Sequence, residues 1–218
     1  MSLTVAIIGA GPLGRWLALS AARAGFRVLL EDVMPANLHH AREYIRGQLG
    51  PDQARVSLPA GKLDTEGGGG FNPRISPEET MGALAPEEQP KGNPPVNYVS
   101  TIEDAVREAD LAIDCVPDEL ESKLEILWLL DRMAPPRTVF ATPTTRLSIA
   151  DLAGCTYREG KCVAIAAEAR DLAGNSGAEI LLRTTARTTP ETIALVENFW
   201  RRLGFTPTFQ QEAAVSGL

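Results

Sequence analysis

The chain has 218 residues, of which 44% are hydrophobic, and its formal net charge is −7. This length and apolar content can bury the core of a globular domain, whereas a net negative charge without a long basic run argues against nucleic acid or an anionic membrane as a partner. The three cysteines, Cys115, Cys155 and Cys162, lack the spacing of a zinc site or a disulfide framework, so we expect small-molecule partners, a reducing cytoplasmic setting and no metal.

The first predicted strand covers residues 5–8, a short apolar run typical of a strand buried on both faces of a parallel sheet. Apolar residues then recur at helical spacing over 13–24, and Gly25 ends that helix. A second buried strand over 27–32 leads into a second helix over 35–49. This strand, helix and strand together have the length that a parallel crossover connection needs.

Residues 50–97 are rich in proline and glycine, and we interpret them as an insertion that acts as a linker or lid. Within this insertion only residues 76–84 have a helical pattern. Ser76 is the expected N-cap of that short helix, with Pro77 at its first position and Glu79 completing a capping box.

Strand and helix patterns alternate in the rest of the chain. They cover a strand over 97–100, a helix over 101–109, a strand over 110–116, a helix over 118–133, a strand over 138–143, a helical turn over 148–153, a strand over 162–168, a strand over 179–185, a helix over 189–203 and a strand over 206–211. Such alternation predicts an α/β fold with a Rossmann-like, doubly wound and mostly parallel sheet. We expect a single domain over 1–207 and a C-terminal tail over 208–218.

Three glycines with the spacing G-x-G-x-x-G follow the first strand directly. In a dinucleotide fold, Gly9 would allow the tight turn, Gly11 would let a pyrophosphate approach the backbone, and Gly14 would let helix and strand pack closely. The helix that opens here would present its N-terminus to the phosphates. The other interpretation is a purely structural turn. Because the glycines interrupt the apolar run, we expect neither a signal peptide nor a transmembrane span.

Asp32 ends the second strand, 18 residues after Gly14, where a carboxylate can accept hydrogen bonds from the adenosine ribose. A carboxylate here repels the 2′-phosphate of NADP, and residues 33–38 contain no arginine or lysine, so NAD is the expected cofactor. Glu31 points to the other side of the strand, and we expect it to be solvated.

Two longer segments resemble the L-3-hydroxyacyl-CoA dehydrogenase family in its N-terminal NAD-binding domain. They are VAIIGAGPLGRWLALSAARAGFRVLLEDVMPANL at 5–38 and ADLAIDCVPDELESKLEILWLLDRMAPPRTVFATPTTRLSIADLA at 109–153. Weaker similarity continues to about residue 207. The resemblance implies a nicotinamide-binding fold and oxidation of a 3-hydroxyacyl thioester, with a histidine as general base and a glutamate that orients it.

The resemblance also implies roles for the loops that follow later strands. Asp114 and residues 116–118 would line the loop over the nicotinamide ribose, and Lys123 matches a family lysine. Thr142, Thr144 and Thr145 would approach the ring and the substrate carbonyl. Lys123 could instead pair with Glu119 on the helix surface, and the threonines could serve only the strand and the cap of the next turn. Together with the glycine motif, the predicted cofactor contacts are Gly9, Gly11, Pro12, Leu13, Gly14, Asp32, Val116, Pro117, Lys123 and Thr142.

The catalytic residues of the family are largely missing. The position of its histidine falls at Ala166, and the histidines of this chain, His39 and His40, lie on the second helix, where we expect them to be solvated. The family asparagine and serine beside the nicotinamide map to Pro143 and Thr145. The remaining candidates for proton transfer are Thr145, Glu168, Glu179, which lies near the family glutamate, Lys161 and Tyr157.

We also expect the chain to lack the helical second domain of the family and its basic contacts with CoA, for which only Lys62, Arg74 and Lys91 remain. Three functions stay open. The chain is an NAD(H)-binding protein that is catalytically degenerate or needs a partner chain, an active oxidoreductase on a 3-hydroxyacyl or 3-oxoacyl (CoA) substrate with a rewired base, or an interaction protein that has lost the nucleotide. Trp128 and Trp200 either belong to the core or are exposed and serve a homodimer.

Overall fold

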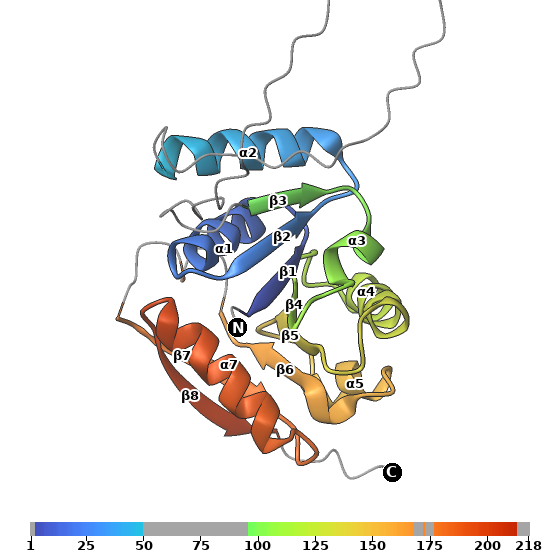
Figure 1. Cartoon of the computed structure of the whole chain (residues 1–218). Helices are drawn as coiled ribbons and strands as arrows, with labels where there is room; N and C mark the ends of the chain where they lie inside the picture. Colours follow the sequence, from blue (N-terminus) through green and yellow to red (C-terminus); the bar gives the residue numbers. More distant parts are fainter. Residues whose placement is uncertain (1–2, 50–95, 168–171, 173–176, 213–218) are drawn as a thin grey trace, which may run out of the picture.

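The computed structural model describes residues 3–49, 96–167, 172 and 177–212. They form one eight-stranded sheet with helices on both faces (Figure 1). The strands are β1 (Thr4–Ile8), β2 (Arg27–Glu31), β3 (Val96–Val99), β4 (Leu111–Asp114), β5 (Val139–Pro143), β6 (Cys162–Ile165), β7 (Glu179–Thr184) and β8 (Thr206–Gln211). The helices are α1 (Pro12–Arg23), α2 (Pro35–Leu49), α3 (Ile102–Val106), α4 (Leu120–Met133), α5 (Ile149–Gly154) and α7 (Pro190–Arg202), with a 3-10 turn η1 (Glu159–Lys161).

The strand order is β3-β2-β1-β4-β5-β6-β7-β8. Strands β1 to β6 are parallel, β7 is antiparallel to β6, and β8 is parallel to β7. The order 3-2-1-4-5-6 is that of a doubly wound dinucleotide-binding fold, in which ligands bind at the carboxyl ends of the strands where the order reverses. The predicted fold class, a Rossmann-like and mostly parallel α/β sheet, is confirmed.

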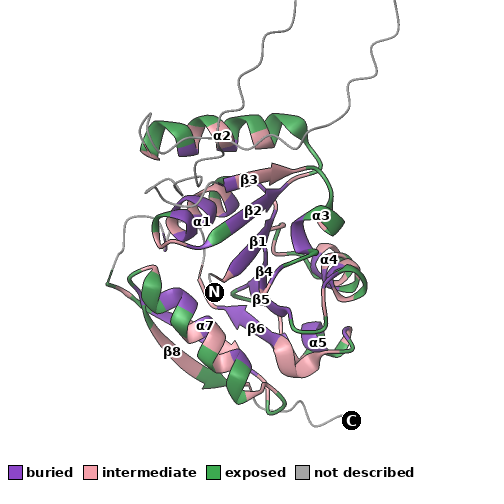
Figure 2. Cartoon of the chain, in the orientation of Figure 1, coloured by how far each residue is buried: buried purple, intermediate pink, exposed green. Residues whose placement is uncertain are grey.

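Two apolar layers hold the helices against the sheet. On one face, residues of α1, α2 and α7 pack against alternate residues of the strands, with Trp200 only 1% exposed. On the other face, α3, α4 and α5 cover the remaining strand residues. Figure 2 shows the result: the central strands are buried, and exposed residues lie along the outer side of α2. Because both faces are covered, strands such as β1 carry continuous apolar runs.

The strands and helices predicted within the described residues are present, with ends that differ by at most three residues. Thr189 caps α7, since its side chain accepts a hydrogen bond from the N–H of Thr192. The helix predicted over 76–84 lies outside the described residues. Strand β8 pairs with β7 through Gln211, so the sheet extends into the segment predicted as a tail from residue 208.

Two surface expectations need correction. Glu31 was expected to be solvated, but it is 2% exposed, because β3 pairs with β2 and places Val99 opposite Glu31. Trp128 and Trp200 do not share one environment: Trp200 is in the core, whereas Trp128 is 49% exposed and the Arg132 guanidinium lies over its ring. His39 and His40 are exposed, as expected. Among the described residues, no helix combines the length and the apolar character that crossing a membrane requires.

Candidate cofactor site

The first and third glycines of the motif shape the turn between β1 and α1. Gly9 has φ of 100°, a conformation that side chains other than glycine rarely adopt, and its N–H donates to the carbonyl of Glu31 at 2.8 Å. A Cβ on Gly14 would lie 1.8 Å from the carbonyl oxygen of Gly9. The start of α1 therefore rests directly on the turn, which only a glycine at position 14 permits.

Gly11 has a different environment. It is the N-cap of α1, it has φ of −65°, and a Cβ there would meet no atom within 4 Å. The space above the turn is thus open, and Pro12 begins the helix behind it. An N-terminal helix turn that faces open space favours an anion through its dipole and its N–H groups. This cradle, which a side chain at Gly11 would fill, fits the diphosphate of a dinucleotide.

The carboxylate of Asp32 joins this turn to the connection between β2 and α2. One oxygen accepts from the N–H of Ala10 at 2.8 Å, and the other accepts from the N–H of Met34 at 2.8 Å. The side-chain amide of Asn37 contacts both oxygens. In the described part of the chain these amide groups are its hydrogen-bond partners, and no cation is among them.

A buried polar network lies beneath the loop that follows β4. Lys123 Nζ is 3.0 Å from Oδ2 of Asp114, and the hydroxyl of Thr142 donates to the same oxygen at 2.7 Å. The other oxygen of Asp114 accepts from the N–H of Val116 at 2.9 Å. Lys123 therefore does not pair with Glu119 on the helix surface, because its whole side chain is buried with Asp114. The network fixes the backbone of the loop from within the fold.

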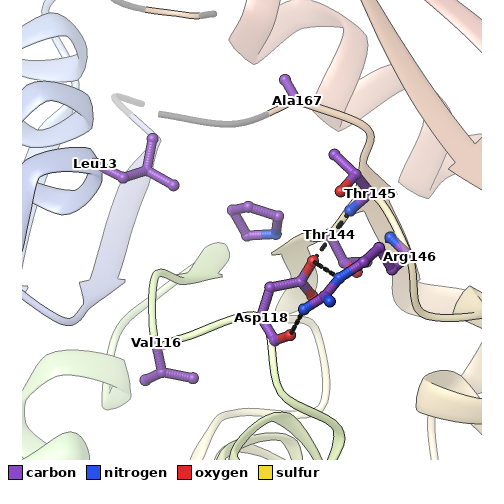
Figure 3. Close-up of a pocket in the computed structure, with 8 residues that line it drawn as sticks. Leu13, Val116, Asp118, Thr144, Thr145, Arg146 and Ala167 are labelled. Carbon is purple, nitrogen blue, oxygen red and sulfur yellow. Dashed lines mark hydrogen bonds and ion pairs between the residues drawn. The ribbon is translucent and has the colours of Figure 1, made fainter. Parts of the chain in front are cut away.

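The carboxyl ends of β4, β5 and β6 and the start of α1 surround a cavity of about 460 Å³ (Figure 3). The cavity is lined by Leu13, Val116, Asp118, Pro143, Thr144, Thr145, Arg146 and Ala167. Five residues with predicted roles are thus brought together from separate parts of the sequence: Leu13, Val116, Asp118, Thr144 and Thr145. Two others, Lys123 and Thr142, lie in the buried network instead.

One charged residue of this cavity, Arg146, was not among the residues with a predicted role, whereas Asp118 was. The N–H of Thr145 donates to Oδ2 of Asp118 at 3.3 Å, and Arg146 Nη2 donates to the backbone carbonyl of Asp118 at 3.0 Å. Figure 3 shows Asp118 facing both Thr145 and Arg146, with a dashed line to each. Oδ1 of Asp118 is buried and has no hydrogen-bond partner among the described residues. The signal for Arg146 in the sequence was its position directly after the predicted threonines.

The cavity carries no histidine at the end of β6. Ala166 occupies the position predicted for the histidine, and the next residue, Ala167, lines the cavity. A shift of one residue in the alignment with the family therefore still places an alanine at the site of the histidine. Glu179 is exposed at the start of β7 and does not line the cavity, while Glu168 lies outside the described residues. Lys161 directly precedes β6 and therefore lies at the amino end of that strand, away from the cavity at its carboxyl end. Tyr157 is fully exposed.

The sequence matches the family model described as 3-hydroxyacyl-CoA dehydrogenase, NAD binding domain, over residues 4–166. Among curated proteins, the chain is 27% identical over 159 residues to a probable 3-hydroxybutyryl-CoA dehydrogenase of Bacillus subtilis, covering 73% of this chain and 46% of that protein. It is 32% identical over 150 residues to 3-hydroxyadipyl-CoA dehydrogenase of Escherichia coli, covering 69% and 26%.

The fold is similar to that of solved structures. The crystal structure of (S)-3-hydroxybutyryl-CoA dehydrogenase from Ralstonia eutropha superposes with a TM-score of 0.71 at 19% identity, covering 98% of this chain and 65% of that chain. The chain thus spans less than half the length of the two curated relatives and about two thirds of this structure.

Proposed function

This chain belongs to the 3-hydroxyacyl-CoA dehydrogenase family, in its NAD-binding domain, with NAD as the cofactor, and on that premise we propose that it is an NAD(H)-binding protein that is catalytically degenerate on its own. In this proposal it carries out little hydride transfer unless a partner chain completes the site.

The observation that carries the proposal is the pair of alanines at the end of β6. Oxidation of an alcohol by hydride transfer needs a group that takes the hydroxyl proton, and a positioned base contributes about 10² to 10⁴ in rate. Neither Ala166 nor Ala167 has a side chain that can take a proton, so no base is present whichever of the two positions corresponds to the family histidine. The contacts for the diphosphate and the adenosine ribose follow β1 and β2, which β4 and β5 separate from β6 in the sheet, so binding can persist where chemistry is lost.

The residues of the cradle have separable roles in this proposal. The turn at Gly11 and the start of α1 hold the diphosphate, and Asp32 accepts hydrogen bonds from the adenosine ribose. The cavity beside Val116 and Thr145 takes the nicotinamide half, over the loop that the Asp114 network supports. When bound, NAD supplies the acceptor for a hydride.

A second candidate function is an active NAD-dependent oxidoreductase on a 3-hydroxyacyl or 3-oxoacyl (CoA) substrate with a rewired proton-transfer group. The observation that favours it is the chemistry of the cavity, where the carboxylate of Asp118 and the hydroxyl of Thr145 lie together. A glutamate such as Glu179, or a group from a second copy or a partner subunit, would otherwise have to supply the base.

Two measurements test the proposal. Isothermal titration calorimetry with NADH is expected to give saturable binding, and absence of binding would favour the interaction-protein alternative. Reduction of acetoacetyl-CoA by NADH is expected to be slow in the natural chain and to rise by about 10² in Ala166→His or Ala167→His, since either places an imidazole at the end of β6. A natural rate within about tenfold of a histidine-bearing relative would overturn the claim of degeneracy.

A further inference from the structure

An arginine of β7 and a glutamate after β8 attach the C-terminal strands to the loop that lines the cavity after β5. Arg183 of β7 donates through Nη2 to the backbone carbonyls of Thr144 at 2.8 Å and Leu147 at 3.0 Å. Its Nη1 is 3.0 Å from Oε1 of Glu212, directly after β8. One guanidinium thus binds two backbone carbonyls of the loop and the residue after the last strand.

Glu212 completes the attachment at the other end of the loop. Its Oε2 accepts from the hydroxyl of Ser148 at 2.8 Å and from the N–H of Ala150 at 3.0 Å. Ser148 is the N-cap of α5, so the carboxylate binds the start of that helix. The N–H of Glu212 in turn donates to the carbonyl of Thr184, which fixes the position of the glutamate beside β7.

The pair is largely withdrawn from solvent, since the side chain of Arg183 is 16% exposed and that of Glu212 is 22% exposed. Charge-assisted hydrogen bonds in such a setting are stronger and more directional than those of exposed pairs. In the C-terminal unit of residues 177–212, the exposed Arg187 pairs with Glu159, but its hydrogen bonds go to Thr185 and Glu159, which do not line the cavity, whereas those of Arg183 reach Thr144, which does. The position of Arg183 and Glu212 is therefore distinctive among the ion pairs of β7, α7 and β8.

We propose that Arg183 and Glu212 are positioning residues that set the shape of the Thr144–Ser148 loop and thereby the fit of the nicotinamide half of NAD(H). This inference rests on the proposed function, which assigns that half to the cavity. Arg183 acts through Thr144, which lines the cavity, and Glu212 acts through Arg183 and Ser148, so neither residue needs to contact the cofactor. The other half of the cofactor is served by Gly11 and Asp32, whose hydrogen bonds involve neither residue.

The test compares NADH with ADP-ribose, which lacks the nicotinamide, in Arg183→Met and Glu212→Gln. We expect the Kd of NADH to rise at least about tenfold in either variant while that of ADP-ribose changes less than about twofold, because only the nicotinamide half depends on the loop. Arg183→Lys, which keeps the charge but not the planar fork, is expected to give an intermediate Kd for NADH. Glu212→Gln keeps the size of the side chain and one acceptor oxygen. If Arg183→Met fails to fold, the comparison of NADH with ADP-ribose is made on Glu212→Gln.

Arg187→Gln is the matched control, because it breaks an ion pair of the same unit away from the cavity and should leave both Kd values unchanged. Equal weakening of both ligands, or no change in either, would overturn the positioning role and leave a purely structural brace. If the natural chain bound neither ADP-ribose nor NADH, the proposed function itself would be refuted, and this inference with it, before any variant is compared.

Discussion

The ammonium of Lys123 lies 3.0 Å from Oδ2 of Asp114, and neither side chain has any exposure to solvent. Removing two charges from water is costly, and such a pair persists only where further hydrogen bonds satisfy both partners. Thr142 and the N–H of Val116 supply those bonds to Asp114, and the carbonyl of Val116 lies 3.4 Å from Lys123 Nζ. The pair therefore couples α4 to β5 and to the loop that lines the cavity.

Breaking this pair should destabilise the fold strongly. Lys123→Met leaves the carboxylate of Asp114 buried without its cation, and we expect the free energy of unfolding to fall by about 3 to 5 kcal/mol, measured by urea denaturation. The double variant Lys123→Met with Asp114→Asn should recover part of this loss, because no unpaired charge remains. Arg201→Gln, which breaks an exposed pair with Glu197 on α7, is the control and should change little. A Lys123→Met protein as stable as the natural one would contradict the structure of the network.

The glycine motif predicts different outcomes for two similar substitutions. Gly14→Ala should unfold or severely destabilise the chain, because the new Cβ would lie 1.8 Å from a backbone oxygen. Gly11→Ala meets no atom within 4 Å, so its melting temperature should stay close to the natural value while its affinity for NADH falls by about tenfold or more.

Gly47→Ala is the control for both substitutions. It lies on the exposed side of α2 with open space around it, so it should raise stability by about 0.5 to 1 kcal/mol and leave NADH binding unchanged. If Gly11→Ala bound NADH as tightly as Gly47→Ala, the diphosphate would not approach the backbone at this turn.

Glu31 should make stability depend on pH. Burial, with a smaller effect of the neighbouring Asp32 charge, raises the pKa of Glu31 from 4.5 to about 7. Between these two values the folded chain holds a proton that the unfolded chain releases, so this group makes stability fall as pH rises from about 4.5 to 7, by up to about 3 kcal/mol, and adds no further change above.

Glu31→Gln removes this titration and keeps the shape of the side chain. We therefore expect the variant to gain stability relative to the natural chain as the pH is raised from 5 to about 7.5, in chemical denaturation measured at both pH values. A difference between the two proteins that is the same at both pH values would show that Glu31 titrates normally.

Asp32 should govern the choice between the two nicotinamide cofactors. Asp32→Asn keeps the size and one acceptor oxygen but removes the charge, so we expect NADH to bind about tenfold more weakly and the preference for NADH over NADPH to narrow. Calorimetric titration of both cofactors measures this ratio, with Glu43→Gln on the exposed side of α2 as the control. An unchanged preference would mean that discrimination resides elsewhere.

The predicted contacts that depend on local geometry follow directly from neighbouring residues. The apolar run before Gly9, the helix after Pro12 and the strand that ends at Asp32 are close in sequence, and a short crossover unit leaves few ways to arrange them. The positions of Gly9, Gly14 and Asp32 around one turn could for this reason be predicted without a structure.

The burial of charged residues and the contacts between distant loops depend on long-range packing. From the sequence, Lys123 has the pattern of a surface residue of an amphipathic helix, and Glu31 that of a solvated strand end. In the fold, Lys123 is buried with Asp114 and Thr142 of β5, and β3 pairs beside Glu31. Arg183 meets Thr144 across 39 residues of sequence, which no periodicity records.

The strand-helix-strand unit at the start of the chain, the glycine turn at Gly11 and the alanine at position 166 could be read from residue identity and from neighbours along the chain. The strand order, the burial of polar groups such as Lys123 and the contacts of Arg183 depend on how distant elements pack. The physical reason is that burial is a property of the surfaces that distant elements bring together, and it therefore leaves no trace in the local pattern of any one of them.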